Sequence, residues 1–316
     1  MRRRRLGKRQ PRRASPAGRL GEQTRPDMNY SKRFVVEPGA KVKLHKIDPG
    51  YIDPDLTEKD ALAETKKLYK KLRNLQASLY SEKQRSVLIV LQALDTAGKD
   101  GVINHVLGAM SPLSCRVASF KKPGPEAAAH NYLWRVSIFL PEKGEVVIFN
   151  RSHYEDVLVV KVHDLVPQEH LVKRYHQLNS FERFLTDNDT HVLKFFLHVS
   201  KEEQLRRFKR RLDDPKRHWK ISDADYKERK FFGAYTEAYE EALSRCNTER
   251  APWYIIPSDC KWFRNLAVAR ITVDFLEGLQ IRAPLPTVDL GAIRKEYEDA
   301  AKEATGKHGE STVLRD

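Results

Sequence analysis

Residues 86–110 read SVLIVLQALDTAGKDGVINHVLGAM and contain the clearest strand-turn-helix pattern of the chain. Val87–Leu91 is an unbroken run of β-branched residues and leucine, which is typical of a central parallel strand covered on both faces. After the turn, apolar residues recur at helical spacing of three and four positions. They are Val102, Ile103, Val106, Leu107 and Met110. The stretch therefore predicts a strand, a tight turn and a helix.

The turn itself, ALDTAGKD at residues 93–100, follows most of the GxxxxGK[ST] pattern of phosphate loops. Such a loop presents backbone N–H groups and the positive end of a helix dipole to one anion. Two positions depart from the pattern: Ala93 replaces the first glycine, and Asp100 stands where a hydroxyl normally reaches Mg²⁺. Since Asp95 and Asp100 would repel a bound phosphate unless a divalent cation lay between them, the loop also predicts a metal.

An ordinary strand-to-helix turn is the alternative interpretation of this loop. The buried strand before it and the amphipathic helix after it favour phosphate binding instead. We therefore assign phosphate binding to the loop and the start of the helix. The residues assigned are Ala97, Gly98, Lys99, Asp100 and Gly101.

The length and composition predict one large α/β domain, since 316 residues of which 40% are apolar can bury a single large core. No apolar run approaches the ~20 residues of a membrane span, and no signal-peptide core follows the first arginines. The three cysteines, Cys115, Cys246 and Cys260, are widely spaced, which predicts neither disulfides nor a zinc site. A cytoplasmic protein is expected.

The positive charge is concentrated at the N-terminus. Residues 1–27 carry ten basic and two acidic side chains, which leaves +7 of the formal +15 for the remainder. This segment has no periodic apolar residues, so it is expected to be a disordered tail. A nucleic-acid or membrane arm is the alternative, but a solvated tail is favoured. The basic remainder suits a polyanionic ligand.

The rest of the chain alternates predicted helices and strands. Residues 28–56 contain Pro-Gly pairs and are expected to be extended. Five leucines then mark a long amphipathic helix, namely Leu62, Leu68, Leu72, Leu75 and Leu79. Further strands are predicted at Arg116–Phe120, Val146–Phe149, Val192–Val199 and Trp253–Ile256. This alternation predicts a parallel β-sheet flanked by helices.

A second polar cluster, NRSHYED at residues 150–156, follows the predicted strand Val146–Phe149. It should lie at the carboxyl edge of the sheet, where open α/β folds bind ligands. Asn150 occupies the position at which phosphate-loop enzymes usually supply an aspartate to Mg²⁺. Arg151 is a candidate for neutralising a phosphate, and Glu155 and Asp156 are candidates for metal or acceptor contacts. A polar loop with a surface ion pair is the alternative.

The third motif is SKEEQLRRFKRRLDDPKRHWKIS at residues 200–222. Ser200 and Glu203 form a capping-box pattern that predicts a helix start. Leu205, Phe208 and Leu212 are expected to form its apolar stripe, which would place the arginines on the other face. Those arginines are Arg207, Arg210 and Arg211. We interpret the region as a mobile lid that brings arginines onto transferring phosphates, and a solvated cationic helix is the alternative.

Taken together, these motifs resemble the polyphosphate kinase 2 family over about residues 34–280. The motifs are LQALDTAGKDG (91–101), SFKKP (119–123), FNRSHYEDVLV (149–159), LKFFLHVSKEEQLRRF (193–208), RLDDPKRHWKIS (211–222) and APWYIIPSDCKWF (251–263). The resemblance is to the branch that phosphorylates both nucleoside mono- and diphosphates. It implies a three-layer phosphate-loop kinase core with a helical lid, dependence on Mg²⁺ or Mn²⁺, and a homo-oligomer.

The resemblance also implies roles for individual residues. Asp95 matches the loop aspartate that acts with metal and acceptor phosphate, and Lys99 matches the loop lysine. Arg151 matches the arginine after the second motif, and Arg207 and Arg211 match the lid arginines. Lys122, Arg217 and Lys220 are expected to help bind the donor, and Asp95 and Asn150 to hold the metal.

The expected reaction is a reversible, direct, in-line phosphoryl transfer from inorganic polyphosphate to AMP and ADP, the latter giving ATP. The catalytic residues assigned are Asp95, Lys99, Arg151, Glu155, Arg207 and Arg211. The expected domain spans residues 57–280, with the lid at about 205–230 and a partly helical extension at 281–316. An ATP-dependent nucleotide kinase and, less favoured, a basic nucleic-acid-binding protein remain open as alternatives.

Overall fold

The structure, a computed structural model, describes residues 29–221 and 223–306, so the predicted basic tail at residues 1–27 lies outside the described residues. Its centre is a five-stranded, all-parallel sheet with the order β2-β3-β1-β4-β5. The strands are β1 (Ser86–Ala93), β2 (Cys115–Ser119), β3 (Val146–Asn150), β4 (Thr190–His198) and β5 (Trp253–Pro257). Every residue of β1 is buried. The predicted parallel sheet and its central strand are therefore confirmed.

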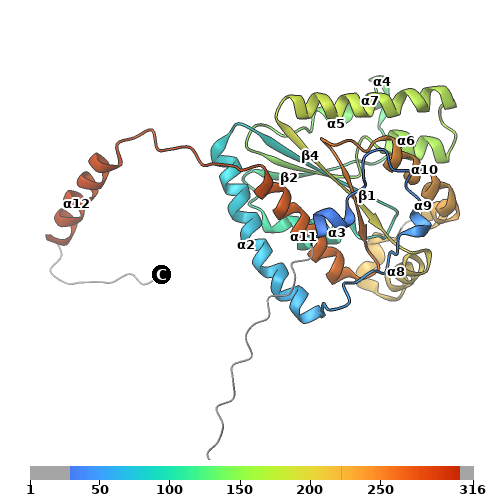
Figure 1. Ribbon diagram of the computed structural model, residues 1–316, viewed down its shortest axis with the longest axis horizontal. Coiled ribbons are helices and arrows are strands. Elements are labelled where there is room, and N and C mark those ends of the chain that lie inside the picture. The colour runs from blue at the N-terminus through green and yellow to red at the C-terminus, as the bar shows by residue number, and fades with distance from the viewer. Residues whose placement is uncertain (1–28, 222, 307–316) are drawn as a thin grey trace, which may run out of the picture.

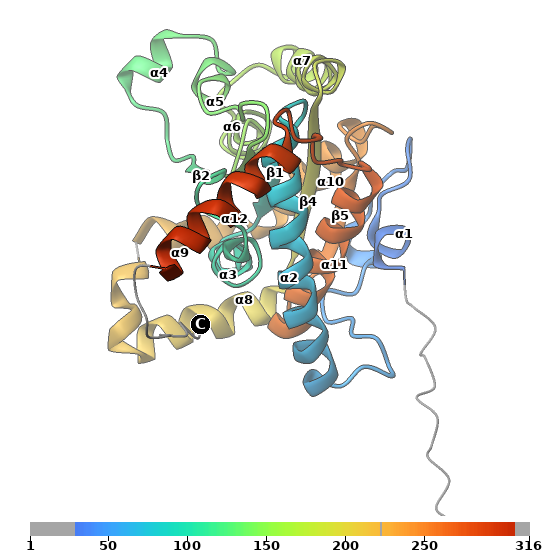
Figure 2. The same cartoon turned by 90° about the vertical axis from the view of Figure 1, so that its left-hand side faces the viewer.

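The sheet lies between two layers of helices, which confirms the predicted three-layer α/β class. One layer holds α2 (Glu58–Glu82), α3 (Lys99–His105) and α11 (Lys261–Gly278). The other holds α6 (Glu155–Val162), α7 (Gln168–Asp187) and α10 (Phe232–Arg245). Figure 1 shows α2 and α11 on one side of the strands and α6, α7 and α10 on the other, and Figure 2 shows α2 and α11 from their outer side.

The register of the sheet brings two loops together at its carboxyl edge. Leu91 of β1 pairs with Asn150, the last residue of β3. Because both strands run in the same direction, the loop after β1 and the turn after β3 leave the sheet side by side. This edge carries the phosphate loop and the second polar cluster.

The helix after the phosphate loop is shorter than its sequence pattern predicts. α3 ends at His105, and a 3₁₀ turn at Leu107–Ala109 follows it. Val102, Val106 and Met110 are buried all the same. Bonds from residue i+3 to residue i replace helical ones here, as from Met110 N–H to the Leu107 carbonyl, and this tighter turn still directs the apolar side chains inward.

α2 confirms the predicted long helix with one correction. Thr57 caps its start by accepting a hydrogen bond from the Asp60 N–H, and Lys83 ends it in a left-handed conformation. Leu68, Leu72 and Leu79 are buried as the periodicity predicts, but Leu62 is exposed. Leu62 lies at the end of α2 that borders the pocket described below.

Several further helices lie before, between and after these elements in the described part of the chain. α1 (Tyr30–Phe34) and a 3₁₀ turn at Leu44–Lys46 are the regular elements of the segment before α2, and α1 contacts α11 and β5. At the other end, α12 (Leu290–Gly306) stands apart from the domain (Figure 1). Between β2 and β3 lie α4 (Pro125–Ala129) and α5 (Trp134–Ser137).

Two expectations from composition can be compared with the structure. The cysteines are free thiols, as predicted, and burial raises the pKa of Cys246 to about 12. Across residues 29–221 and 223–306, no helix combines the length and apolar character needed to cross a membrane.

Candidate active site

A pocket of about 790 Å³ opens at the carboxyl edge of the sheet, where the loop after β1 and the turn after β3 meet. Most of the predicted site residues line it. They are Asp95, Gly98, Lys99, Asp100, Gly101, Asn150, Arg151, Arg207, Arg211, Arg217 and Lys220. The structure therefore brings together three motifs that are about 50 residues apart in the chain.

Three predicted residues are not in the wall of this pocket. Ala97 is part of the loop but is completely buried. Lys122 is exposed, and its neighbour Lys121 borders the pocket instead. Glu155 lies behind Arg151, whose Nη1 donates to Glu155 Oε2 at 3.3 Å. Glu155 therefore reaches the site through Arg151.

The phosphate loop has backbone conformations that suit glycine. Gly98 has φ +116°, in the region that L side chains rarely adopt. A Cβ atom on Gly98 would also lie 1.9 Å from Arg264 Nη1, and one on Gly101 would lie 2.9 Å from Arg264 Nη2. The φ of Gly98 therefore favours glycine, and a Cβ at either position would have to displace the guanidinium of Arg264, a buried arginine from α11 that packs directly against the loop. This contact was not predicted from the sequence.

Lys99 begins α3 and points back along the loop. Its Nζ donates to the Ala93 carbonyl oxygen at 2.9 Å. Burial lowers the pKa of Lys99, and the nearby Arg151 adds to this effect, while the carboxylates of Asp95, Glu155 and Asp100 act in the opposite direction. A bound phosphate would offer the ammonium group a stronger acceptor than a neutral carbonyl.

Arg151 joins the two loops. Its Nη2 donates to Asp95 Oδ1 at 2.8 Å, while its Nη1 contacts Glu155. The residue adopts φ +63°, a left-handed conformation that is uncommon for a side chain of this size. Although burial acts against the charged form, the Glu155 and Asp95 carboxylates raise the pKa of Arg151, so it remains cationic.

Asp156, which the sequence offered as a further metal or acceptor contact, has a different environment. Its Oδ2 accepts a hydrogen bond from Arg135 Nη2 at 2.8 Å, and Arg174 Nη1 lies 4.0 Å from its Oδ1. The carboxylate is buried. It therefore ties α6 to α5 and α7 and does not face the pocket.

Three oxygen-bearing side chains near the loop suit a hard divalent cation. Asp95 and Asn150 are the predicted ligands, and Asn150 Nδ2 lies 3.4 Å from Asp100 Oδ1. The structure thus adds Asp100 to the candidate ligands. No group of three histidine, cysteine or acidic side chains that could hold a metal occurs in the described part of the chain. Mg²⁺ in kinase sites commonly uses one or two carboxylates together with substrate phosphates and water, so this sparse set fits it.

α8 (Lys201–Asp213) confirms the predicted helix start but corrects its predicted faces. Ser200 accepts a hydrogen bond from the Glu203 N–H as expected. However, Leu205 and Leu212 are 45% and 57% exposed, so the predicted apolar stripe is wrong. Phe208 alone of the three is buried, and beside it lies Arg207, which is 6% exposed.

Arg207 lies on the buried face because Glu203 and the surrounding backbone carbonyls accept hydrogen bonds from its guanidinium group. Nε donates to Glu203 Oε1 at 2.7 Å, and the two terminal nitrogens donate to four carbonyl oxygens at 2.5–3.0 Å. The carbonyls belong to Thr96, Ala97, Ser258 and Asp259. All five N–H donors of Arg207 are thereby engaged. The residue fastens α8 to the phosphate loop and to the end of β5.

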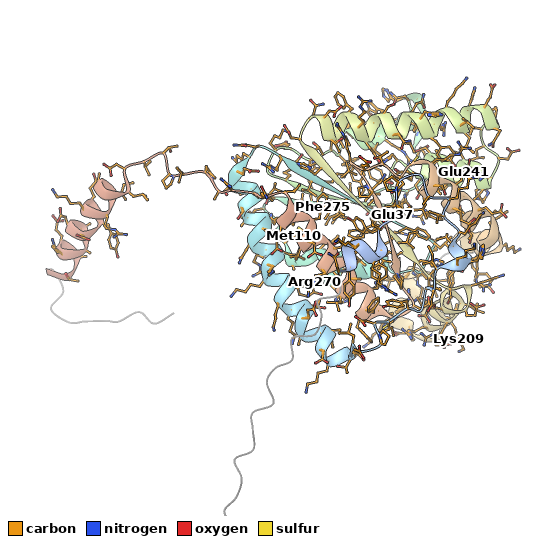
Figure 3. All side chains as sticks on the ribbon, in the orientation of Figure 1. Glu37, Met110, Lys209, Glu241, Arg270 and Phe275 are labelled. Carbon is orange, nitrogen blue, oxygen red and sulfur yellow. The ribbon has the colours of Figure 1, made fainter. Side chains whose placement is uncertain are left out.

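The other lid arginines border the pocket. Arg210, Arg211 and Arg217 line it together with Lys220, whose Nζ lies 3.5 Å from Asp100 Oδ2. Lys209, in contrast, lies at the outer edge of α8 and pairs with Asp213 (Figure 3). The predicted lid region continues through a 3₁₀ turn (Pro215–Lys220), α9 (Asp223–Glu228) and a second 3₁₀ turn (Arg229–Phe231).

The N-terminal turn of α11 supplies a wall that was missed in the sequence. Lys261, Trp262, Arg264 and Asn265 all border the pocket. Burial and the surrounding arginines, Arg210 and Arg207 foremost, lower the pKa of Lys261 to about 8. Burial and Arg207 likewise lower the pKa of Arg264 to about 10. The clue in the sequence was that these residues follow β5, so they had to meet the same carboxyl edge.

Comparison with known proteins finds relatives over most of the chain. The family model described as polyphosphate kinase 2 matches residues 55–284. An AMP/ADP-polyphosphate phosphotransferase from Meiothermus ruber is 47% identical over 256 residues, covering 81% of this chain and 96% of the relative. An ADP-polyphosphate phosphotransferase from Rhodopseudomonas palustris is 40% identical, covering 81% and 93%.

A solved structure gives the same result. The crystal structure of polyphosphate kinase 2 from Arthrobacter aurescens TC1 superposes with a TM-score of 0.81 at 36% identity, covering 85% of this chain and 96% of that chain. The family model, which matches residues 55–284, spans the sheet, the loops that bound the pocket and the lid region. The chain therefore belongs to the polyphosphate kinase 2 family.

Proposed function

We propose that this protein transfers phosphoryl groups reversibly between inorganic polyphosphate and the nucleotides AMP and ADP. The observation that carries the proposal is the convergence of cations from four parts of the chain on one pocket. They are Lys99 from the loop, Arg151 from the turn after β3, Arg210, Arg211, Arg217 and Lys220 from the lid, and Lys261 and Arg264 from α11. Such a surface suits a long polyanion, and the named relatives act on AMP or ADP.

The loop and Lys99 would hold the phosphoryl group that moves. Lys99 Nζ would exchange the Ala93 carbonyl for a phosphate oxygen, and the N–H groups at the start of α3 would donate to the same group. Arg151 lies beside Asp95, where the acceptor phosphate would approach, and would stabilise charge on the transferring oxygens.

The lid arginines would have different roles. Arg211 and Arg217 line the pocket and would contact the donor. Arg207, with its donors already engaged by backbone carbonyls, would position α8 over the loop. We thus propose contact with phosphate for Arg211 and support of the site for Arg207.

Asp95, Asp100 and Asn150 would hold Mg²⁺. When bound, the ion supplies charge neutralisation between these carboxylates and the substrate phosphates. The protein's part is to present hard oxygen ligands at the loop while Arg151 keeps the Asp95 carboxylate oriented.

The test is product analysis in the absence of ATP. Purified protein incubated with long-chain polyphosphate, Mg²⁺ and either AMP or ADP should form ADP and ATP, resolved by ion-exchange chromatography. A Lys99→Met variant serves as the control for contaminating kinases. No conversion of either nucleotide by the folded wild type would refute the proposal, whereas conversion of ADP alone would restrict the acceptor.

A further inference from the structure

A lysine is buried in the middle of the central sheet. Lys194 belongs to β4, next to β1, and its side chain is 0% exposed. Its Nζ donates to Glu182 Oε2 of α7 at 2.6 Å and to the Cys246 carbonyl at 2.7 Å. Glu182 is 1% exposed. Burying two charges in this way carries a large desolvation cost, so apolar residues of similar size would stabilise the fold as well.

The ion pair is connected to one particular turn. We define the β3–α6 turn as residues 151–154, which link β3 to α6. Tyr154 Oη donates to Glu182 Oε1 at 2.7 Å and accepts from Lys194 Nζ at 2.9 Å. His153 Nε2 lies 3.2 Å from the same Glu182 oxygen. His153 and Tyr154 are both 0% exposed.

The charge state of Glu182 supports these contacts. Although burial acts in the opposite direction, Lys194 and His153 lower the pKa of Glu182, so the carboxylate remains ionised. An ionised carboxylate accepts strong hydrogen bonds from both the tyrosine hydroxyl and the lysine ammonium. The turn is thus fastened to α7 and β4 through charge-assisted hydrogen bonds.

A second buried contact holds the turn from the side of β1. Gln92 Nε2 donates to Ser152 Oγ at 3.0 Å, and Tyr239 Oη donates to Gln92 Oε1 at 3.1 Å. Ser152 Oγ also accepts the Tyr154 N–H at 3.2 Å. The turn therefore contacts three strands or helices through polar groups that water does not reach.

The residue that begins this turn is Arg151. Its left-handed backbone is unfavourable for arginine and persists only where the surroundings impose it. The side chain then reaches Asp95 across the mouth of the pocket. The position of Arg151 thus depends on what fixes residues 152–154.

We propose that Lys194 and Glu182 are positioning residues, which hold the β3–α6 turn so that Arg151 remains directed at the phosphate loop. The inference rests on the proposed phosphoryl transfer only for its kinetic consequence. Its structural consequence, a fixed turn, can be tested without any activity.

The test compares an apolar replacement of the network with a matched replacement elsewhere. The triple variant Lys194→Met/Glu182→Leu/Tyr154→Phe removes the charges and the hydroxyl while keeping side-chain volume. The control Lys161→Met/Glu241→Leu removes another lysine–glutamate pair, which ties α6 to α10. Figure 3 labels Glu241 of this pair. Both are compared with wild type by thermal unfolding, by amide hydrogen exchange and by kinetics.

We expect the triple variant to unfold near the wild-type temperature, since it no longer has the desolvation cost of the buried charges, and this gain offsets the lost hydrogen bonds. Amide exchange in residues 151–155 should become at least tenfold faster, with the exchange of β1 unchanged. The kcat should fall about 10- to 100-fold, because small displacements of a catalytic group have effects of this size. The KM for polyphosphate should stay within about twofold, while the control keeps wild-type exchange and kcat.

Wild-type exchange in the turn of the folded triple variant would overturn the inference, as would a loss of kcat equal to that of the control. If the triple variant does not fold, Tyr154→Phe alone removes one hydroxyl from the network and is judged by the same exchange and kcat criteria. A wild type with no phosphoryl transfer would refute the proposed function, and hydrogen exchange would still decide whether the network fixes the turn.

Discussion

Arg151 Nη2 lies 2.8 Å from Asp95 Oδ1, so a single ion pair joins the turn after β3 to the phosphate loop after β1. The two side chains are 36% and 25% exposed, a degree of exposure at which an ion pair adds about 1 kcal/mol or less to stability. Its importance is therefore geometric. It sets two oppositely charged groups at the point where the acceptor phosphate would enter.

Asp95→Asn should separate activity from stability. The amide removes the charge that the ion pair and the proposed metal require, so we expect kcat/KM to fall at least 100-fold. The melting temperature should change by only about 2 °C or less, since the pair is partly exposed. Steady-state kinetics and calorimetry measure both quantities. A drop in activity that merely parallels unfolding would show that Asp95 is structural.

Lys99→Met should cost about 3 kcal/mol or more of transition-state stabilisation, measured from the ratio of kcat/KM values. Lys99 is the cation at the start of α3, where the loop N–H groups converge. The matched control is Lys209→Met, which removes an exposed lysine at the outer edge of α8. Equal effects of the two substitutions would mean that the loop lysine contributes only general charge.

Lys261 should make donor binding depend on pH. Its pKa of about 8 reflects burial and the facing cations Arg210, Arg207, Arg264 and Arg217, so the ammonium form is lost as pH rises through 8. A bound polyanion favours the charged form. The KM for polyphosphate should therefore rise between pH 7 and 9 in the wild type.

Lys261→Met provides the comparison for this pH effect. Its KM should already be raised at pH 7 and should rise less steeply up to pH 9. Titration of polyphosphate itself affects both proteins equally and so cancels in the comparison. Parallel pH profiles of KM would place Lys261 outside the donor site.

Removal of divalent metal should abolish transfer. The carboxylates of Asp95 and Asp100, both in the phosphate loop, line the pocket, and without a cation they would repel a bound phosphate. Activity should vanish in excess EDTA and return with added Mg²⁺, as followed by nucleotide chromatography. Full activity in EDTA would show that the cationic side chains alone neutralise the substrates.

Much of the site could be predicted because it depends on local pattern and parallel strands. The apolar run of β1 and the helical spacing after Lys99 predicted where the loop lies. The rule that polar residues after parallel strands meet at one edge then brought Asn150 and Arg151 to it. The apolar run of β1 and the parallel direction of the strands are sufficient for these assignments.

The errors arose where one residue's environment is made by distant parts of the chain. The spacing of Leu205, Phe208 and Leu212 predicted an apolar stripe, yet Arg207 is buried, because carbonyls from the loop and from the end of β5 satisfy it. The contact of Arg264 with Gly98 joins residues 166 positions apart. No local pattern in the sequence indicates such pairs.

Lys194 shows the same limit in a strand. Its neighbours are apolar, and the run Val192–Val199 predicted a strand, but a lysine there gives no indication of its partner. The partner, Glu182, lies in α7 twelve positions earlier, and the turn that both hold is about 40 positions before Lys194. Only the packed structure shows that this lysine is hydrogen-bonded to the turn that carries Arg151 in the candidate active site.

The central claim, that polyphosphate rather than ATP is the phosphoryl donor, is tested most directly by a donor comparison. Radiolabelled AMP is incubated with the protein and Mg²⁺ together with either long-chain polyphosphate or a nonradioactive nucleoside triphosphate, and labelled ADP is measured over time. We predict that labelled ADP, and then labelled ATP, forms when polyphosphate is the sole donor. The kcat/KM with polyphosphate should be well above that with the triphosphate. Formation of labelled ADP only with the triphosphate would contradict the claim and identify an ATP-dependent nucleotide kinase.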